Sequence, residues 1–135
     1  MTTSADSPRG EGTVLLVDDE PVVRTVAQRM LEHLGFEVRV ATDGREALDV
    51  FREHADSIRL VILDLAMPEI GGEEAFTEMR RIRSDVPVIM SSGYDEQEVS
   101  TALAGKGLTA FIQKPYRLAA LQESVRAALE EPQSD

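Results

Sequence analysis

The sequence predicts an open α/β fold, in which a parallel β-sheet is covered by helices on both faces. Five short runs rich in Val, Ile and Leu alternate along the chain with five segments of helical period. The first, third and fourth runs are apolar throughout, as expected of strands that are buried on both faces of a parallel sheet. A chain of 135 residues with 42% hydrophobic residues is sufficient for one such domain.

The five apolar runs are the predicted strands. They are TVLLV (13–17), EVRVA (37–41), LVIL (60–63), PVIM (87–90) and AFIQ (110–113). Residues 1–12 and 131–135 are polar and carry Gly or Pro, which predicts flexible tails or linkers. The predicted domain is therefore 13–130.

The first two helices follow from apolar residues at helical spacing. The first is predicted from about Pro21 to Leu34, because Pro is tolerated in a first turn and Gly35 is a typical stop. The second is predicted over about 45–55. The residues predicted to face the core are Val23, Val26, Ala27, Met30 and Leu34 in the first, and Ala47, Leu48 and Phe51 in the second.

Three further helices are predicted over about 72–83, 95–104 and 117–130. The helix over 95–104 has a thin apolar stripe, so we expect it to be the most mobile. The predicted core residues are Ala75, Phe76, Met79 and Ile82, then Val99, Ala102 and Leu103, then Leu118, Leu121, Val125, Ala128 and Leu129. Three arginines are expected mostly to face water, namely Arg80, Arg81 and Arg83.

Composition excludes several classes of function. The formal net charge is −11, from 25 acidic and 14 basic residues, so the field of the protein repels nucleic-acid backbones. The chain has no cysteine, which excludes disulfides, thiolate nucleophiles and thiolate metal sites. No apolar segment is suited to a signal peptide or a membrane span. These observations predict a soluble, cytoplasmic protein that binds neither nucleic acid nor, directly, a membrane.

Polar side chains follow four of the five predicted strands. Asp18 and Asp19 follow the first strand and Asp64 follows the third. Ser92 follows the fourth strand and Lys114 the fifth. Since ligands of open α/β sheets bind at the carboxyl ends of the strands, we expect these side chains to converge on one edge.

Each of these residues also has a plain structural interpretation. Asp19 would serve as a helix N-cap, and Asp64 could satisfy backbone N–H groups in an Asx-turn. Ser91 and Ser92 could simply end a strand, and Lys114 could be a surface charge. These separate interpretations do not explain why all the polar groups fall at the same end of the strands.

The cluster has a chemical interpretation as a phosphoryl-transfer site. Neighbouring carboxylates require a compensating cation, and oxygen ligands of this kind suit Mg²⁺. Asp64, alone on the predicted central strand, is the candidate nucleophile for an aspartyl-phosphate. Asp18 and Asp19 would hold the metal directly or through its waters.

Four motifs in order, LLVDDEP, VILDLAMP followed by GG, VIMSSGY and FIQKPY, resemble the receiver domain of two-component response regulators. The resemblance covers about 13–130. It implies a flavodoxin-like (βα)5 doubly wound sandwich with a parallel five-stranded sheet in the order 2-1-3-4-5. The motifs VIMSSGY and FIQKPY look most like receivers at the C-terminus of hybrid histidine kinases, and a free-standing receiver is the alternative.

The resemblance also implies roles for individual residues. Asp64 is the expected phosphoacceptor, and Asp18 and Asp19 form the acidic pair of the metal site. The backbone carbonyl of Ala66 is a further expected ligand, and Lys114 pairs with the phosphoryl group. The expected cofactor is Mg²⁺, with Mn²⁺ as a possible substitute.

Three more residues take their expected roles from the family. Ser92 is at the switch Ser/Thr position and Phe111 at the switch-aromatic position, while Pro115 follows the lysine. Phosphorylation would draw Ser92 and Lys114 to the phosphoryl group and let Phe111 turn inward. This change would bias the face formed by the fourth helix, the fifth strand and the fifth helix.

The implied function is phosphorelay signal transduction. A histidine kinase or a histidine phosphotransfer domain, in the same chain or another, would donate the phosphoryl group from phosphohistidine. Beyond self-catalysed phosphotransfer and autodephosphorylation, no enzyme activity is expected. Because no effector domain or DNA-binding motif follows residue 131 in this sequence, we expect the output to pass through a partner protein or an attached kinase.

Two positions near the acceptor predict a long-lived aspartyl-phosphate. Ala66 is too small to reach an attacking water, and Tyr94 is large enough to cover the phosphoryl group. The histidines, His33 and His54, fall on predicted helices away from the edge and are expected to be surface residues.

Three other functions compete with this interpretation. A haloacid-dehalogenase-type phosphatase would require an acid at position 66, where this chain has Ala66. A flavin or dinucleotide site would require a glycine-rich loop after the first strand, where the acidic pair would instead repel a pyrophosphate. A receiver that is an unphosphorylated interaction platform is the third possibility, and the retained acidic pair, Asp64, Ser92 and Lys114 argue against it.

Overall fold

The computed structural model describes residues 12–64, 71–83, 85–92, 110–114 and 116–130. Along the chain the elements are β1 (Thr13–Val17), α1 (Pro21–His33), β2 (Glu37–Ala41), α2 (Gly44–Glu53), β3 (Ile58–Asp64), α3 (Gly72–Ile82), β4 (Val88–Ser92), β5 (Ala110–Gln113) and α5 (Leu118–Glu130). The fourth predicted helix, over 95–104, and the two predicted tails lie outside the described residues.

The strands form one parallel sheet in the order β2-β1-β3-β4-β5. The predicted fold class and strand order are therefore confirmed. The order reverses between β1 and β3, which are paired with each other in the sheet. In open α/β sheets the crevice at such a reversal, outside the carboxyl ends of the strands, is where ligands bind.

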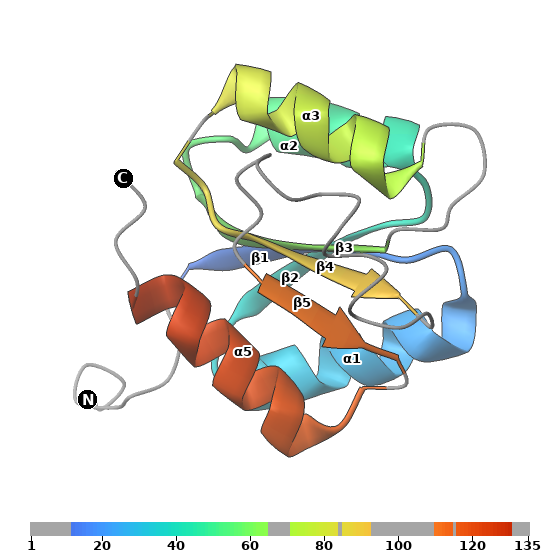
Figure 1. Cartoon of the computed structure of the whole chain (residues 1–135), viewed down its shortest axis with the longest axis vertical. Coiled ribbons are helices and arrows are strands. Elements are labelled where there is room, and N and C mark those ends of the chain that lie inside the picture. The colour runs from blue at the N-terminus through green and yellow to red at the C-terminus, as the bar shows by residue number, and fades with distance from the viewer. Residues whose placement is uncertain (1–11, 65–70, 84, 93–109, 115, 131–135) are drawn as a thin grey trace.

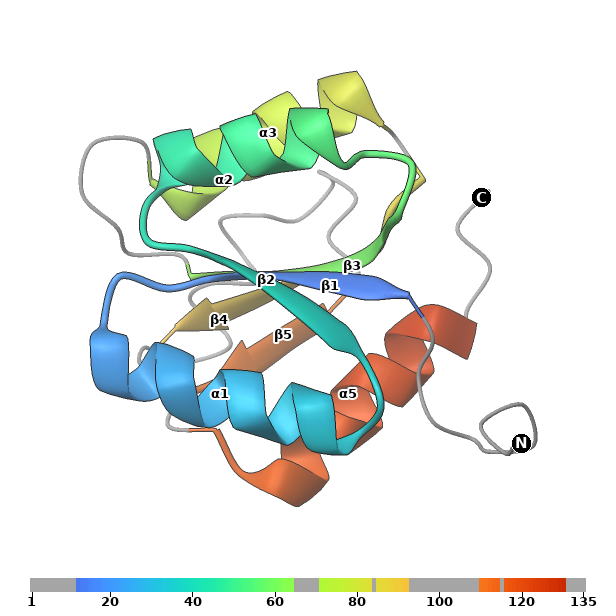
Figure 2. The same ribbon diagram turned by 180° about the vertical axis from the view of Figure 1, so that it is seen from behind.

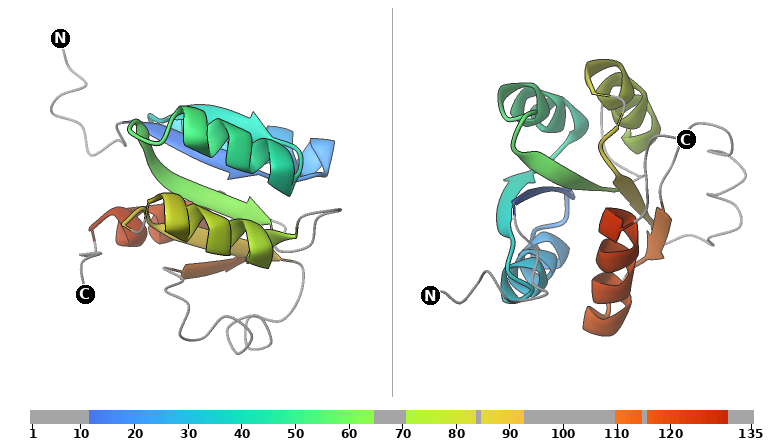
Figure 3. Two further views of the ribbon diagram at one scale, coloured as in Figure 1. Left: turned by 90° about the horizontal axis from the view of Figure 1, so that it is seen from above. Right: turned by 90° about the vertical axis from the view of Figure 1, so that its left-hand side faces the viewer.

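Helices cover both faces of the sheet in a three-layer arrangement. Helices α2 and α3 lie over one face, and α1 and α5 lie over the other (Figures 1 and 2). The side view in the right panel of Figure 3 shows the two helical layers on opposite sides of the strands. This arrangement buries every residue of β1 and explains why the four residues that follow Thr13 in that strand are all apolar.

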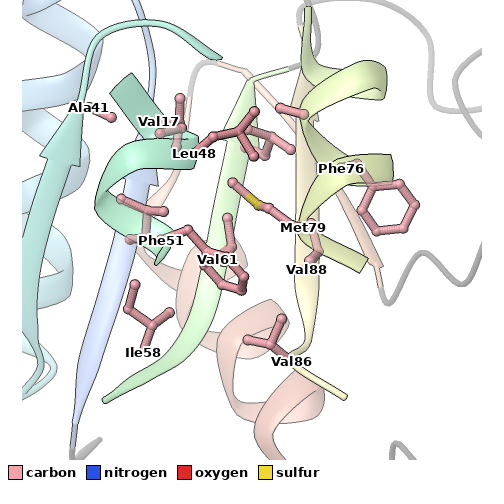
Figure 4. Close-up of a cluster of buried hydrophobic side chains, with 14 of the residues drawn as sticks. Val17, Ala41, Leu48, Phe51, Ile58, Val61, Phe76, Met79, Val86 and Val88 are labelled. Atoms are coloured by element: carbon pink, nitrogen blue, oxygen red, sulfur yellow. The ribbon is translucent and has the colours of Figure 1, made fainter. Parts of the chain in front are cut away.

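Two separate apolar cores result from the alternation of side chains along the central strands. On the α2/α3 face, Val17 of β1 and Val61 of β3 belong to one cluster with Leu48 and Phe51 of α2 and Met79 of α3 (Figure 4). On the α1/α5 face a second cluster contains Val14, Leu16, Ala27, Leu31, Leu60, Ile62, Ile89, Leu121 and Val125, among others. The two cores hold the central strands between them and so fix the edge at which these strands end.

Several element boundaries and exposures differ from the sequence prediction. Strand β3 begins at Ile58, two residues earlier than predicted, and includes Asp64. Strand β4 begins at Val88, one residue later than predicted, and ends at Ser92, two residues later than predicted. On α1, Val26 is 44% exposed, because the buried line of the helix runs through Ala27 and Leu31 instead. Leu118, predicted to face the core from α5, is exposed as well.

The prediction that three arginines face water is correct for Arg81 and wrong for Arg80 and Arg83. Arg80 donates to the backbone carbonyl of Val86, and its guanidinium lies 5.0 Å from the centre of the Phe76 ring. Arg83 donates to the carbonyls of Ala55 and Ile58, both at 2.6 Å. These two side chains satisfy loop carbonyls at the amino end of β3 and β4, which periodicity alone does not reveal.

The two ends of α1 are formed differently. Gly35 has a φ of +105°, its N–H donates to the carbonyl of Glu32, and the next N–H, of Phe36, donates to Leu31. This Schellman arrangement confirms Gly35 as the predicted stop. At the amino end the N-cap is Glu20, which makes no side-chain capping bond, so the interpretation of Asp19 as the N-cap is wrong.

Among the described residues, no helix is long and apolar enough to cross a membrane.

Helix α2 has a polar cap at its amino end. The carboxylate of Asp43 accepts from the N–H of Glu46 at 2.8 Å. The Glu46 carboxylate in turn accepts from the backbone N–H of Thr42 at 2.8 Å and from its hydroxyl at 2.9 Å. The N–H of Glu46 is one of those that the helix itself leaves without partners, and the bonds from Thr42 fix the chain that enters the helix.

We expect Asp43→Ala to lower the free energy of unfolding by about 1 kcal/mol, because the N–H of Glu46 loses its acceptor. Urea denaturation followed by circular dichroism measures the change. Asp49→Ala is the matched control, since Asp49 is exposed on the same helix and lies 3.8 Å from Arg52. Equal stability of the Asp43→Ala variant and the control would show that the cap contributes nothing.

Candidate functional site

Two buried carboxylates lie at the ends of the adjacent strands β1 and β3. Asp18 directly follows β1 and is 0% exposed, and Asp64 is the last residue of β3 and is 1% exposed. The pairing of Val17 with Leu63 places the two acids side by side at the carboxyl edge of the sheet. Burial of two carboxylates is costly unless other groups compensate their charge.

The ammonium of Lys114, immediately after β5, compensates both acids. Its Nζ lies 3.3 Å from Asp18 Oδ2 and 3.3 Å from Asp64 Oδ2. The same ammonium lies 3.1 Å from Glu20 Oε1. Burial on its own lowers the pKa of Lys114, but the charges of Asp64 and Asp18 and the hydrogen bond to Glu20 outweigh it and raise that pKa above its ordinary value. Lys114 is therefore charged at every physiological pH.

Backbone contacts hold Asp18 in one orientation. Its Oδ1 accepts from the N–H of Glu20 at 2.9 Å, and its own N–H donates to the carbonyl of Ala41 at 3.1 Å. Its carbonyl accepts from Nη1 of Arg24 at 2.9 Å, which ties α1 to the end of β1. The carboxylate is thus positioned before any ligand binds.

The acids form a group suited to a divalent metal. One carboxylate oxygen from each of Asp18, Asp19 and Asp64 lies within 4.8 Å of the other two. Asp18 and Asp64 are buried and Asp19 is exposed, so the group is open on one side. Oxygen-only donors with negative charge fit Mg²⁺ or Mn²⁺ and do not favour soft metals.

The structure therefore brings together Asp18, Asp19, Asp64 and Lys114, as the sequence predicts. The backbone of Ser92 ends β4 one residue beyond Ser91, the register partner of Asp64, and Phe111 lies within β5. The side chains of Ser92 and Phe111 are not among those described. Ala66, Tyr94 and Pro115 lie outside the described residues.

The family follows from comparison with known proteins. Residues 14–126 match the sequence profile of the response regulator receiver domain. The chain belongs to this family. As a receiver it is 36% identical over 121 residues to sensor kinase CckA of Brucella abortus, covering 90% of this chain and 13% of the kinase. It is 34% identical to response regulator MprA of Mycolicibacterium vanbaalenii, covering 86% of this chain and 49% of the regulator.

Solved structures agree with this assignment. The receiver domain from hybrid histidine kinase CckA superposes with a TM-score of 0.75 at 37% identity, over 88% of this chain and all of that domain. The CheX-CheY-BeF3-Mg complex from Borrelia burgdorferi contains a chain that superposes with a TM-score of 0.84 at 26% identity, over 89% of this chain and 90% of that one. The predicted resemblance to receivers, including that of a hybrid kinase, is thus confirmed.

The two histidines, His33 and His54, lie away from the acidic site. His33 is exposed at the end of α1, and His54 is half-buried after α2, in the loop that leads to the amino end of β3. Neither histidine contributes to the site, as predicted.

Sequence reasoning missed the contribution of Glu20. Its side chain is 60% exposed, yet it makes the shortest of the three ion-pair contacts to Lys114. Its place directly after the acidic pair in LLVDDEP was the available clue. The run of Asp19, Glu20 and Pro21 resembles an ordinary helix start, so it suggested a helix cap and not a contact of Glu20 with Lys114.

We expect Lys114→Met to lower the free energy of unfolding in metal-free buffer by about 3 kcal/mol, because Asp18 and Asp64 lose their buried countercharge. Mg²⁺ should recover much of the loss and bind the variant more tightly than wild type, since the metal no longer competes with the ammonium. Urea denaturation with EDTA and with Mg²⁺ measures both effects.

Arg81→Met is the matched control, because Arg81 is exposed and lies 3.8 Å from Glu78. It should change stability by less than about 0.5 kcal/mol in either buffer. A Lys114→Met variant as stable as this control without metal would contradict the compensation argument.

Proposed function

We propose that this receiver accepts a phosphoryl group from phosphohistidine onto Asp64 and so acts in a phosphorelay. The observation that carries the proposal is the buried Asp64 carboxylate, which lies beside Asp18 and 3.3 Å from the ammonium of Lys114. A carboxylate fixed at the end of a rigid strand, with a cation against it, is arranged to attack phosphorus.

In the proposed reaction an oxygen of Asp64 attacks the phosphorus and the N–P bond of phosphohistidine breaks, leaving its electron pair on the imidazole nitrogen. Lys114, already within reach of Asp64, neutralises charge on the phosphoryl oxygens. Asp18, Asp19 and Asp64 would hold Mg²⁺, with the backbone carbonyl of Ala66 as a further ligand. When bound, the metal would supply further positive charge to the phosphoryl oxygens. The structurally similar CheX-CheY-BeF3-Mg complex, which contains both Mg²⁺ and BeF3, supports the placement of a metal and a phosphoryl-like group at one site.

The phosphoryl group would bias the receiver toward an active conformation through Ser92 and Phe111. Ser92 is the last residue of β4. Phe111 lies in β5, the strand that pairs with β4, where its register partner is Met90. The affected surface would be β5, α5 and the fourth predicted helix over 95–104. The proposed role is that of a phosphoacceptor with autodephosphorylation, without other enzyme activity.

The proposed donor is a histidine kinase or a histidine phosphotransfer domain, in the same chain or in another. Sensor kinase CckA and response regulator MprA, which this chain matches over part of their length, support both arrangements. The proposed output is control of a partner protein or an attached kinase in the cytoplasm.

Two of the competing functions lose their basis. Because the chain belongs to the receiver family, it is neither a haloacid-dehalogenase-type phosphatase nor a flavin- or dinucleotide-binding domain in this proposal. A receiver that works unphosphorylated is the remaining alternative, and it predicts no covalent adduct on the aspartate.

We expect acetyl phosphate and Mg²⁺ to add one phosphoryl group to the wild-type protein and none to Asp64→Asn, because the amide is not a nucleophile toward phosphorus. Intact-mass spectrometry measures the adduct. Asp56→Asn is the matched control, since Asp56 is exposed in the loop between α2 and β3. Unmodified wild type, also with a phosphohistidine donor, would favour the unphosphorylated platform; an adduct on Asp64→Asn would place the acceptor elsewhere.

We also propose that the aspartyl-phosphate is long-lived, because Ala66 cannot activate a water and Tyr94 would shield the phosphoryl group. Tyr94→Ala should then accelerate decay of the adduct by about tenfold, a barrier change of about 1.4 kcal/mol. Intact-mass spectrometry over time after removal of acetyl phosphate gives the rate constant. An unchanged rate would show that the ring provides no shielding.

A further inference from the structure

Two buried hydroxyl groups next to the acidic site are not explained by the receiver mechanism. Ser91 is 0% exposed and Tyr116 is 8% exposed. Among the described residues, the Oγ of Ser91 and the phenol oxygen of Tyr116 are the buried side-chain oxygens that complete no hydrogen bond. Because unpaired buried hydroxyls are costly, such a pair calls for an explanation.

The two hydroxyls come from the strand ends that flank the site. Ser91 is the register partner of Asp64 on β4. Tyr116 comes two residues after Lys114, and its ring belongs to the α1/α5 core together with Leu121 of α5. Ile89 is in the same core, and strand side chains alternate, so Ser91 is directed toward the face on which Tyr116 is buried.

The electrostatics of the phenol agree with this placement. Burial is the main cause that raises the pKa of Tyr116 above its ordinary value. A hydrogen-bond interaction with Ser91 acts in the opposite direction, and the charges of Asp18, Asp64 and Lys114 also influence the phenol. The two hydroxyls are thus close to each other, yet their geometry does not complete a bond. Each hydroxyl carries a rotatable O–H donor and free lone pairs, so a small rotation of either side chain would complete the hydrogen bond between them.

We propose that the hydroxyls of Ser91 and Tyr116 form a hydrogen-bonded pair that positions Lys114 over the carboxylate of Asp64. Both would be positioning residues, since neither touches the reacting atoms. The proposal rests on the proposed function only in its kinetic consequence.

The physical reason lies in how Lys114 is held. A lysine side chain has four flexible carbon–carbon bonds, so the direction of its ammonium depends on how firmly its backbone is fixed. The ring of Tyr116 anchors the chain just after the lysine, and a bond to Ser91 would fasten that anchor to the strand next to Asp64. The acceptor and its cation would then keep a constant separation.

The variants Tyr116→Phe, Ser91→Ala and the double variant test the proposal. Each single change leaves one buried hydroxyl without a partner, so both stability and the phosphorylation rate should fall. The double change removes both hydroxyls and should recover most of the stability. The phosphorylation rate of the double variant, with acetyl phosphate and saturating Mg²⁺, should stay about fivefold below that of wild type, which corresponds to the loss of one hydrogen bond. This rate should be no lower than the rate of either single variant.

Ser57→Ala is the matched control, because the hydroxyl of Ser57 donates to the carbonyl of His54 at 3.2 Å, in the loop before β3. It should leave the rate unchanged. A double variant as fast as wild type would reduce the pair to a stability contact and overturn the positioning role. A double variant whose loss is the product of the two single losses would show that the hydroxyls act independently, which also overturns the pair.

A measurement on the unphosphorylated, metal-free protein separates this proposal from the proposed function. The chain contains two lysines, Lys106 and Lys114, so the ammonium signals in a ¹H–¹⁵N spectrum are assigned with Lys106→Arg. We expect the Lys114 signal to be visible in wild type and in Ser57→Ala, because ion pairing slows exchange with water, and to broaden in the double variant. An unchanged signal would overturn the proposal whether or not Asp64 accepts a phosphoryl group.

Discussion

The ion pairs of Lys114 with Asp18 and Asp64 are the interaction on which the arrangement of this receiver's edge depends. Strands in a sheet are about 4.8 Å apart, and β4 lies between β5 and β3. The lysine at the end of β5 therefore has to reach over β4 to contact Asp64 and farther still to contact Asp18. Only a long side chain can do this.

The apolar cores supply the rigidity that this pairing needs. Residues of β1 and β3 alternate between the two cores, so neither strand can shift without exposing apolar surface on both faces. The carboxylates at their ends are consequently fixed in position, with further hydrogen bonds to Asp18 from Glu20 and Arg24. The exposed Asp19 lies on the open side of the site.

Charge balance links the resting structure to the proposed chemistry. Among the described residues, four carboxylates gather at this edge, those of Asp18, Asp19, Asp64 and Glu20. They outnumber the ammonium of Lys114 and the nearby guanidinium of Arg24, so this group of residues retains net negative charge. In the proposed function this excess charge would attract a divalent cation, and the cation would offset the charge of a phosphoryl group beside the acids. The ammonium is shared among three carboxylates and can be redistributed when a ligand arrives.

The sequence by itself determined the fold class, the order of elements and the presence of Asp18, Asp64 and Lys114 at strand ends, because apolar periodicity and the position of a residue in a strand are local properties. The family motifs supplied the strand order. Only the tertiary structure decided which partners these groups have: the contact of Glu20 with Lys114, the carbonyl contacts of Arg80 and Arg83, the exposure of Val26, and the adjacent hydroxyls of Ser91 and Tyr116. Several of these contacts join residues far apart in the chain. They depend on strand register, helix rotation and side-chain reach, which no local pattern encodes.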